Sequence, residues 1–453
     1  MKSTPPMLPG LPVLGNVVDF MRDRHALIRR GYAEFGPIFG IKLVSQPTAV
    51  LLNPTYQQLF FTETDKALRI DKPYANLSAL FGKVAFLAPH ATYLEQQPIL
   101  YTPFRPEKMG DYLRIMQREV EAWMAELGES GVIDISGELG RLVQRVAGFA
   151  LMGADFQSKV GREFWDLYAD LGKTLDFVIP PHWPTPNNRR RDRAKKRMIE
   201  ILRPVVAERR RNPTDYDDFL QDFVTAKGRS GALADDETVI GLLRALMFAS
   251  HETTAGQAAW LVIELLRHPQ YLAHVQQEIN THVPPGTALD GKVLRSLQHL
   301  YWAVREIERC HPSADILMRT AAVDVEVGDY RVPAGWNLMV APAVSHRLAT
   351  FFADPEQFDP FRFAPGREED RQHGYTLIGF GGGRHKCAGM NFANHEMAII
   401  TALLLQHFDL TLLTPNPQTT YELGAGRPER TLVRYTRKAH LAAQEEAPQL
   451  LAV

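Results

Sequence analysis

The stretch Phe380-Gly381-Gly382-Gly383-Arg384-His385-Lys386-Cys387-Ala388-Gly389 decides the fold of this chain. It holds one cysteine in a glycine-rich turn that runs into an apolar helix, and a thiolate in such a turn is suited to be the axial ligand of a haem iron. The amides that follow Cys387, Gly389 included, can point at the sulfur, and the positive end of the helix favours the ionised form. The alternative, a buried small hydrophobic residue, leaves the aromatic Phe380, the glycines and the cation two residues before the sulfur unexplained.

A long helix is predicted from Asp236 to Arg267. Apolar residues recur there at helical spacing, and His268-Pro269 ends the pattern. About 32 residues of helix rise about 48 Å, so the helix must cross the molecule. Near its middle, Glu252 can pass protons inward and the Thr253 hydroxyl can hold oxygen or a water. The alternative is an ordinary polar patch on a surface helix.

A charged pattern and several short strand-like runs are weaker evidence about the fold. Glu306-Ile307-Glu308-Arg309 lies on a helix predicted from Leu294 to Cys310, but such a charge pair alone is common on surface helices. Runs typical of β-strands are Ile38 to Val44, Thr48 to Leu52 and Val325 to Val332. The distribution favours a large helical region with one small sheet, made from the N-terminal part and the part after residue 315.

Together these motifs resemble the cytochrome P450 superfamily. The resemblance implies a mainly α protein with a small β region, in which a haem lies between the long central helix and the cysteine loop with its helix. It implies one domain over residues 1–453, with the β-rich part at about 25–70 and 315–350 and helices elsewhere. The expected cofactor is haem b, iron protoporphyrin IX, with Cys387 as the protein ligand of its metal.

The resemblance also assigns roles around the haem. Phe380 shields its proximal side, and His385 pairs with a propionate. Arg319 matches a second position that pairs with a propionate, with a surface cation at a strand edge as the alternative. Glu252 and Thr253 are the expected catalytic residues, as the acid and the hydroxyl that handle protons and oxygen.

The E-x-x-R pattern gains a structural role from the same resemblance. His311-Pro312 follows it at once, and Asp359-Pro360-Phe361-Arg362-Phe363 lies about fifty residues further on. The residues expected to form a buried ion triad behind the haem are Glu306, Arg309 and Arg362. Such a triad holds the cysteine segment in place, because loss of one member strands a buried charge.

Within the superfamily the chain resembles the sterol 14α-demethylases over most of its length. Tyr32–Pro37 looks like that family's approach to its first strand, and Tyr74 with Phe81-Gly82 looks like its substrate lid. By this match Tyr74 reaches a haem propionate; an amphipathic surface residue is the alternative. The residues expected to line the substrate pocket, any of which could instead belong to the core, are Leu77, Leu80, Phe81, Ala245, Ala249, Leu317 and Met318.

Three departures from the sterol 14α-demethylases concern the substrate. Glu252 stands where that family has histidine, Asn76 stands where it has an aromatic residue, and Ala91–Pro98 lacks its basic residues. Glu252 and Thr253 instead restore the acid–threonine pair that is general in the superfamily. The scaffold therefore resembles a sterol demethylase, while the proton-delivery pair resembles a general hydroxylase.

The bulk composition bears on partners and location. A net charge of −1 gives no reason to expect nucleic acid or an anionic membrane as a partner. Two cysteines indicate a reducing compartment, with Cys310 as a buried residue that fills space in the core.

The N-terminal part bears on membrane attachment. The proline-rich stretch Pro5–Pro12 follows no apolar run, so we expect no membrane anchor and a soluble, cytoplasmic protein of bacterial type. The basic run Arg189–Arg197 is predicted to be a solvated helix face, with carrier docking or lipid contact as the alternative.

The predicted function is that of a haem-thiolate monooxygenase. It inserts one oxygen atom from O2 into a bulky, apolar, sterol-, terpenoid- or polyketide-like substrate. About sixty residues follow the cysteine turn, so we expect electrons from a separate ferredoxin with its reductase. One alternative is a haem-thiolate enzyme that does not use O2, either peroxide-driven or rearranging, which the acid–threonine pair disfavours. The other is a non-catalytic haem sensor, which the lack of a signalling domain disfavours.

Overall fold

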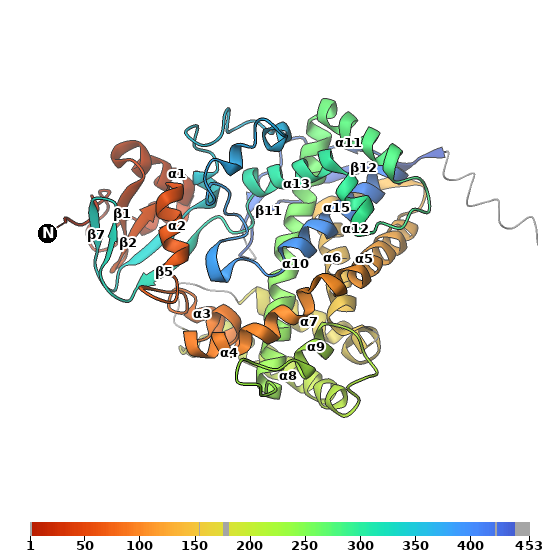
Figure 1. The fold of residues 1–453 in the computed structure, drawn as a ribbon, viewed down its shortest axis with the longest axis horizontal. Helices are drawn as coiled ribbons and strands as arrows, with labels where there is room; N and C mark the ends of the chain where they lie inside the picture. Colours follow the sequence, from red (N-terminus) through yellow and green to blue (C-terminus); the bar gives the residue numbers. More distant parts are fainter. Residues whose placement is uncertain (1, 154, 175–180, 422–423, 440–453) are drawn as a thin grey trace, which may run out of the picture.

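Helices make up most of the molecule (Figure 1). The computed structural model describes residues 2–153, 155–174, 181–421 and 424–439. The α-helices are α1 (Val17–Phe35), α2 (Pro54–Thr62), α3 (Ala75–Phe81), α4 (His90–Tyr101), α5 (Pro106–Leu127), α6 (Ile135–Met152), α7 (Gly161–Gly172), α8 (Pro186–Arg211), α9 (Phe219–Thr225), α10 (Asp236–Arg267), α11 (Pro269–His282), α12 (Gly291–Ser296), α13 (Gln298–Cys310), α14 (Pro342–Ser345) and α15 (Met390–His407). Short 3₁₀ turns are η1 (Ala85–Leu87), η2 (Thr102–Phe104), η4 (Pro360–Phe363), η5 (Glu369–Arg371) and η6 (Gly383–His385), and η3 (Phe156–Val160) is a π-helical turn. The predicted mainly α fold class is confirmed.

The helix α10 runs through the middle of the molecule (Figure 1). It begins at Asp236 and ends at Arg267, as predicted. The Asp235 side chain accepts a hydrogen bond from the amide of Thr238, and so caps the first turn. Because α10 packs against α6, α8 and α15, most of its circumference is buried.

The strands form two main sheets and two hairpins. The five-stranded sheet has the order β1 (Ile38–Leu43), β2 (Gln46–Leu51), β8 (Asn337–Val340), β5 (Leu317–Ala321) and β3 (Leu68–Arg69). Strands β2 and β8 are parallel, and the other neighbours are antiparallel. The three-stranded sheet has the order β4 (Ser130–Asp134), β12 (Leu432–Arg437) and β9 (Phe408–Leu412). The hairpins are β6 (Val325–Val327) with β7 (Tyr330–Val332), and β10 (Thr419–Thr420) with β11 (Arg427–Pro428).

The structure corrects three local predictions. The helix expected from Leu294 to Cys310 is two helices with a break at Leu297, because the Glu278 carboxylate accepts the amides of His299 and Leu300 over 3.0 and 3.1 Å and starts a new helix there. The run from 325 to 332 is a hairpin, not one strand. The three-stranded sheet was not predicted, because its strands are short and far apart in the chain.

The basic run Arg189–Arg197 lies on α8 and is only partly the solvated face that was predicted. Arg193 and Lys196 are exposed, whereas Arg191 is buried. Lys195 turns inward, and its Nζ donates to the carbonyl of Ala79 over 2.9 Å. In the described part of the chain no helix combines the length and apolar character that crossing a bilayer requires.

Candidate active site

The cysteine loop is held in shape by its own backbone. The Cys387 amide donates to the Phe380 carbonyl over 2.9 Å, and the Gly389 amide is directed at the Cys387 sulfur. Burial nevertheless raises the pKa of the Cys387 thiol more than the Gly389 amide lowers it. A bound metal cation would favour the ionised form of the sulfur.

The glycines of the loop are required by contact with α2. A β-carbon on Gly382 would lie 3.0 Å from the Phe61 ring, and one on Gly383 would lie 2.7 Å from the Phe61 carbonyl oxygen. Gly383 also has a φ of +62°, which costs glycine little. Side chains at these two positions would therefore collide with Phe61.

Exposed surface occurs both on the cysteine loop and on the central helix. Cys387 has exposed surface area. Protein atoms nevertheless surround its thiol closely, and this burial raises the pKa of the thiol. On α10, Ala249 is exposed, and Ala245 and Thr253, one turn away on either side, are half-buried. Residues four apart share one face of a helix, so Ala245, Ala249 and Thr253 form one face, the open stripe. Because α10 packs on α15, the helix that follows Cys387, we infer that thiol and open stripe face one space.

Glu252 and Thr253 point in different directions. Thr253 Oγ1 donates to the Ala249 carbonyl over 2.6 Å. The Glu252 carboxylate lies between Arg427 Nη1, 3.3 Å from Oε2, and His251 Nδ1, 3.2 Å from Oε1. Burial raises the pKa of Glu252, but His251 and Arg427 outweigh burial and hold it below its ordinary value. The acid is therefore a carboxylate that must leave these partners before it can pass a proton to Thr253.

A buried cation lies on β5. Arg319 is 4% exposed, and it donates to Thr64 Oγ1 over 3.0 Å and to the Met318 carbonyl over 2.7 Å. Among the described residues no carboxylate lies within ion-pair distance of its guanidinium. The Tyr74 hydroxyl accepts a hydrogen bond from the Met318 amide over 3.1 Å, which places it beside the same strand. A buried guanidinium without an acidic partner fits an anionic ligand group.

His385 has a partner that sequence motifs did not reveal. Its Nε2 lies 2.7 Å from Asp65 Oδ2, and its ring lies 4.3 Å from that of Tyr93. Asp65 has a φ of 72°, a left-handed conformation that aspartate tolerates better than most residues. The contact leaves Nδ1 of His385 as the ring nitrogen that could meet a propionate.

Glu306, Arg309 and Arg362 meet in one fully buried cluster. Arg309 Nε lies 2.7 Å from Glu306 Oε2, and Arg362 Nε lies 3.1 Å from Glu306 Oε1. A fourth member, Glu369, was not predicted; its Oε2 lies 2.7 Å from Arg362 Nη1. Arg309 also donates to the carbonyls of His346, Pro355 and Gln357. The cluster thus ties α13 to the segment that precedes the cysteine loop.

Two further side chains that were not predicted hold that segment. The Glu308 carboxylate accepts hydrogen bonds from the amides of Gly379 and Phe380, and burial raises its pKa to about 7. The buried His346 accepts the Ile378 amide on Nε2 over 2.9 Å. Neither residue stands in a recognisable motif, because their partners lie far along the chain.

The residues expected to line the pocket come from three elements. They are Leu77, Leu80 and Phe81 on α3, Ala245 and Ala249 on α10, and Leu317 and Met318 on β5. Leu80 and Phe81 are 2% and 5% exposed, and the others are half-buried except for the exposed Ala249. The Phe81 ring lies 5.1 Å from that of Phe248, so α3 covers α10 beside the open stripe.

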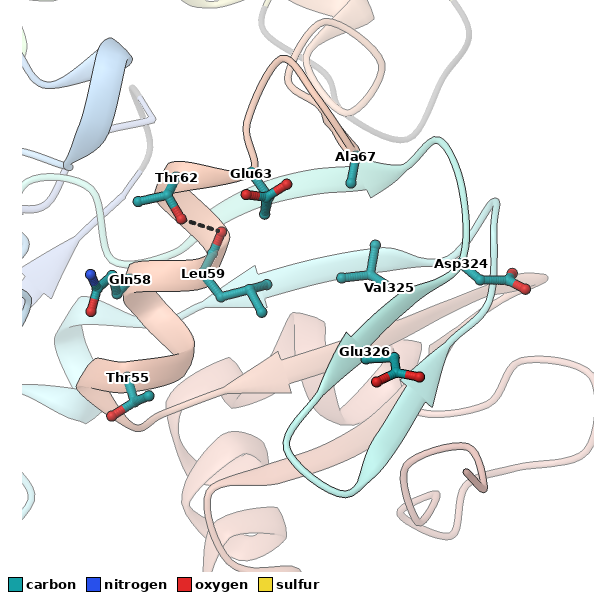
Figure 2. Close-up of a pocket in the computed structure, with 9 residues that line it drawn as sticks. All are labelled: Thr55, Gln58, Leu59, Thr62, Glu63, Ala67, Asp324, Val325 and Glu326. Carbon is teal, nitrogen blue, oxygen red and sulfur yellow. Dashed lines mark hydrogen bonds between the residues drawn. The ribbon is translucent and has the colours of Figure 1, made fainter. Parts of the chain in front are cut away.

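A separate surface groove of about 530 Å³ lies between α2 and the β6 hairpin (Figure 2). Its lining residues are Thr55, Gln58, Leu59, Thr62, Glu63, Ala67, Asp324, Val325 and Glu326. None of them is a predicted site residue, and three of them are carboxylates. The groove is therefore not part of the candidate active site.

Comparison with known proteins places the chain in a family. A family model described as Cytochrome P450 matches residues 5–433. The chain belongs to the cytochrome P450 family. This P450 is 32% identical to a sterol 14-demethylase of Arabidopsis thaliana over 96% of the chain and 92% of that relative. It is 29% identical to a sterol 14alpha-demethylase of Mycolicibacterium vanbaalenii over 97% of the chain and 99% of that relative.

A solved structure shares the fold. It is the retinoic acid-bound cyanobacterial CYP120A1, with a TM-score of 0.88 and 23% identity over 97% of this chain and 100% of that one. As a member of its family, this P450 is a haem-dependent monooxygenase, an oxidoreductase that binds apolar substrates and takes electrons from a redox partner. An exposed thiol on the cysteine loop and a buried cation without an acidic partner are consistent with a haem.

Proposed function

We propose that this P450 inserts one oxygen atom from O2 into a bulky apolar substrate of the sterol, terpenoid or polyketide kind. The second oxygen atom leaves as water, which consumes two electrons from a carrier and two protons from solvent. The observation that carries the proposal is the Thr253 hydroxyl on the open stripe of α10, with the acid Glu252 as its neighbour in the chain. Delivery of protons to oxygen needs a hydroxyl and an acid at such a place.

The cofactor is haem b, whose iron supplies the activation of O2. Cys387 would bind the iron; Phe380 would shield that side of the haem, and the Gly389 amide would polarise the sulfur. The groups that would hold the propionates are Arg319, Tyr74 and Nδ1 of His385. Asp65 then orients His385 from the other ring nitrogen.

Protons would reach the site through Glu252. In the resting arrangement its carboxylate lies between His251 and Arg427, which keep it charged and turned away from the open stripe. Rotation of the side chain would carry a proton from this pair to Thr253. The Thr253 hydroxyl, already donating to the Ala249 carbonyl, keeps its oxygen lone pairs free to accept that proton.

Electrons would come from a ferredoxin with its reductase. Arg384 and Lys386 are exposed on the cysteine loop, three residues and one residue before Cys387. A basic loop above the thiolate suits an acidic carrier, because complementary charge steers the encounter. We likewise propose that the protein is soluble and cytoplasmic.

The sterol resemblance is tested by a substrate screen on the haem-loaded enzyme. Lanosterol, obtusifoliol and a panel of terpenoids and polyketides are titrated, with the haem spin state as the readout of binding. Each ligand that binds is then incubated with NADPH, a ferredoxin and its reductase under ¹⁸O₂. We expect one ¹⁸O atom in each hydroxylated product and no turnover when ferredoxin is left out.

Two outcomes would contradict this function. Equal turnover with hydrogen peroxide alone would identify a peroxide-driven enzyme. Ligand binding without any product under all electron donors would identify a haem sensor. Failure of every sterol to bind would leave the oxygen chemistry in place and remove the sterol from the substrate class.

A further inference from the structure

Two cations converge beneath the C-terminal end of α3. Lys195, on α8, donates from Nζ to the Ala79 carbonyl over 2.9 Å. Arg244, on α10, donates from Nη2 to the carbonyl of Leu80. Figure 1 shows α3, α8 and the N-terminal half of α10 close together, and the three helices contact one another.

Neither cation has an acidic partner. No carboxylate of the described residues lies within ion-pair distance of Lys195 Nζ or the Arg244 guanidinium, and Arg244 Nε is buried without any hydrogen-bond partner. Arg244 is 2% exposed, and burial lowers its pKa to about 10. Burial and the nearby charge of Arg244 lower the pKa of Lys195 as well. Asp192 and Glu237 act on these cations only from beyond ion-pair distance. Two like charges thus share a partly desolvated place without a paired carboxylate, which is costly.

The other buried arginines show how unusual this is. Six arginines are buried in the described chain, namely Arg191, Arg209, Arg244, Arg309, Arg319 and Arg362. Four of them pair with a carboxylate at 3.1 Å or less. The two exceptions are Arg319, where we place a haem propionate, and Arg244. By the same reasoning, the partner of Arg244 is expected to be an anion that comes from outside the protein.

Capping of α3 does not account for the pair. The last carbonyls of a helix need donors, and a positive charge at that end is favourable. One neutral donor would satisfy each carbonyl, however, without placing two charges in a desolvated site. The guanidinium also has five N–H groups, of which Nη2 alone has a partner among the described residues.

The pair lies at one end of the open stripe. Arg244 precedes Ala245, and its guanidinium carbon lies 6.0 Å from the centre of the Phe81 ring, a predicted wall of the pocket. Thr253 lies nine positions after Arg244, which is about 14 Å along the helix axis. A molecule anchored at Arg244 therefore reaches Thr253 if it has the length of a fused three- or four-ring skeleton or of a long alkyl chain.

We propose that Arg244 and Lys195 bind the carboxylate of the substrate, an amphipathic acid whose terpenoid or long-chain body lies along the open stripe. The inference rests on the proposed monooxygenase function and narrows its substrate class from bulky apolar molecules in general to those that carry a carboxylate. A guanidinium pairs with a carboxylate through two parallel hydrogen bonds, which fixes the direction of the molecule. The oxidised carbon then lies at the end remote from the carboxylate.

The test compares an acid with its uncharged ester on the haem-loaded enzyme. Dehydroabietic acid and hexadecanoic acid, each beside its methyl ester, are titrated by haem spin state and by calorimetry. We expect each acid to bind about 10-fold or more tightly than its ester, the effect of one charge-assisted pair. Arg244→Gln should remove this preference and leave the ester affinity unchanged, and Arg244→Lys should restore part of it.

Matched variants separate this role from folding. Lys195→Met should weaken acid binding, whereas Lys196→Met, at the exposed neighbouring position on α8, should not. If Arg244→Gln does not fold, Lys195→Met and the wild-type comparison decide the question alone. Equal affinity for acid and ester in the wild type, or an equal loss for both in the variants, would overturn the proposal. Failure of both acids to bind while the reduced CO complex keeps a thiolate spectrum also overturns it, and leaves the proposed monooxygenase function standing.

Discussion

Arg427 Nη1 lies 3.3 Å from Glu252 Oε2, so the C-terminal hairpin holds the acid of the central helix. The approach is made possible by Gly256, one turn further along α10. A β-carbon there would lie 2.7 Å from the Gly426 carbonyl oxygen and 2.9 Å from Arg427 Cβ. The proposed proton delivery by Glu252 would therefore depend on a strand that is 175 residues away in the chain.

The first prediction concerns this pair. Arg427→Gln removes a positive charge that lowers the pKa of Glu252, so that pKa should rise toward its ordinary value. A group with a lowered pKa is protonated only at low pH, and a raised pKa moves this protonation to higher pH. The acidic limb of the pH–rate profile should therefore shift to higher pH. Arg427→Lys should keep the wild-type profile, and so should Arg430→Gln at an exposed position nearby. An unshifted profile in Arg427→Gln would show that the protonation of Glu252 does not determine the acidic limb of the pH–rate profile.

The second prediction concerns Thr253. Thr253→Ala should keep the spin shift on substrate binding, because the change does not fill the open stripe. Product formed per NADPH should fall by about 10-fold or more, with the electrons diverted to hydrogen peroxide, since proton transfer by a positioned group contributes at least this much. Product and peroxide are measured together. Thr254→Ala, on the buried side of the helix, serves as the control, and normal coupling in Thr253→Ala would remove Thr253 from the relay.

The sequence predicted those features that depend on residues close together in the chain. The limits of α10 followed from apolar residues at helical spacing and from His268-Pro269, and the cysteine loop followed from its composition. The break at Leu297 could not be predicted, because the Glu278 carboxylate that starts the next helix belongs to α11. In the site, Asp65 beside His385 and Arg427 beside Glu252 were also missed. These partners lie 320 and 175 residues away, and no spacing rule connects them.

The third prediction concerns the metal ligand. The reduced CO complex of the wild type should show the strongly red-shifted Soret band of a thiolate trans to CO. Cys387→Ala should abolish this band. Cys310→Ala should keep it, because that thiol is buried at the end of α13, with Arg309 Nη2 3.0 Å from its sulfur. A spectrum typical of histidine ligation in fresh wild-type protein would refute the assignment.

The fourth prediction concerns the buried ion cluster. Arg362→Gln leaves Glu306 and Glu369 without one cation, and breaking a buried pair in this way costs about 3–5 kcal/mol. Haem occupancy and the denaturation midpoint should both drop, or the protein should fail to fold. Arg371→Gln breaks an exposed pair with Glu368 and should leave both unchanged. Full haem occupancy with an unchanged midpoint in Arg362→Gln would show that the cluster is not needed.

The fifth prediction concerns pH and the segment before the cysteine loop. His346 is buried with its Nε2 accepting the Ile378 amide, and burial lowers its pKa from 6.5 to about 3. Between these two values the unfolded chain binds a proton at His346 and the folded protein does not, so the free energy of unfolding falls as the pH is lowered. The slope for one group is about 1.4 kcal/mol per pH unit, which gives a loss of about 2 kcal/mol between pH 6.5 and pH 5.

His346→Gln tests this contribution, since glutamine can accept the Ile378 amide but does not titrate. Denaturant unfolding of wild type and variant is followed at pH 6.5 and pH 5. The variant should lose about 2 kcal/mol less than the wild type over this range. His274→Gln, at an exposed position on α11, should behave as the wild type does. An equal loss in His346→Gln and the wild type would mean that His346 is protonated in the folded state, and that the Ile378 amide is held by other contacts.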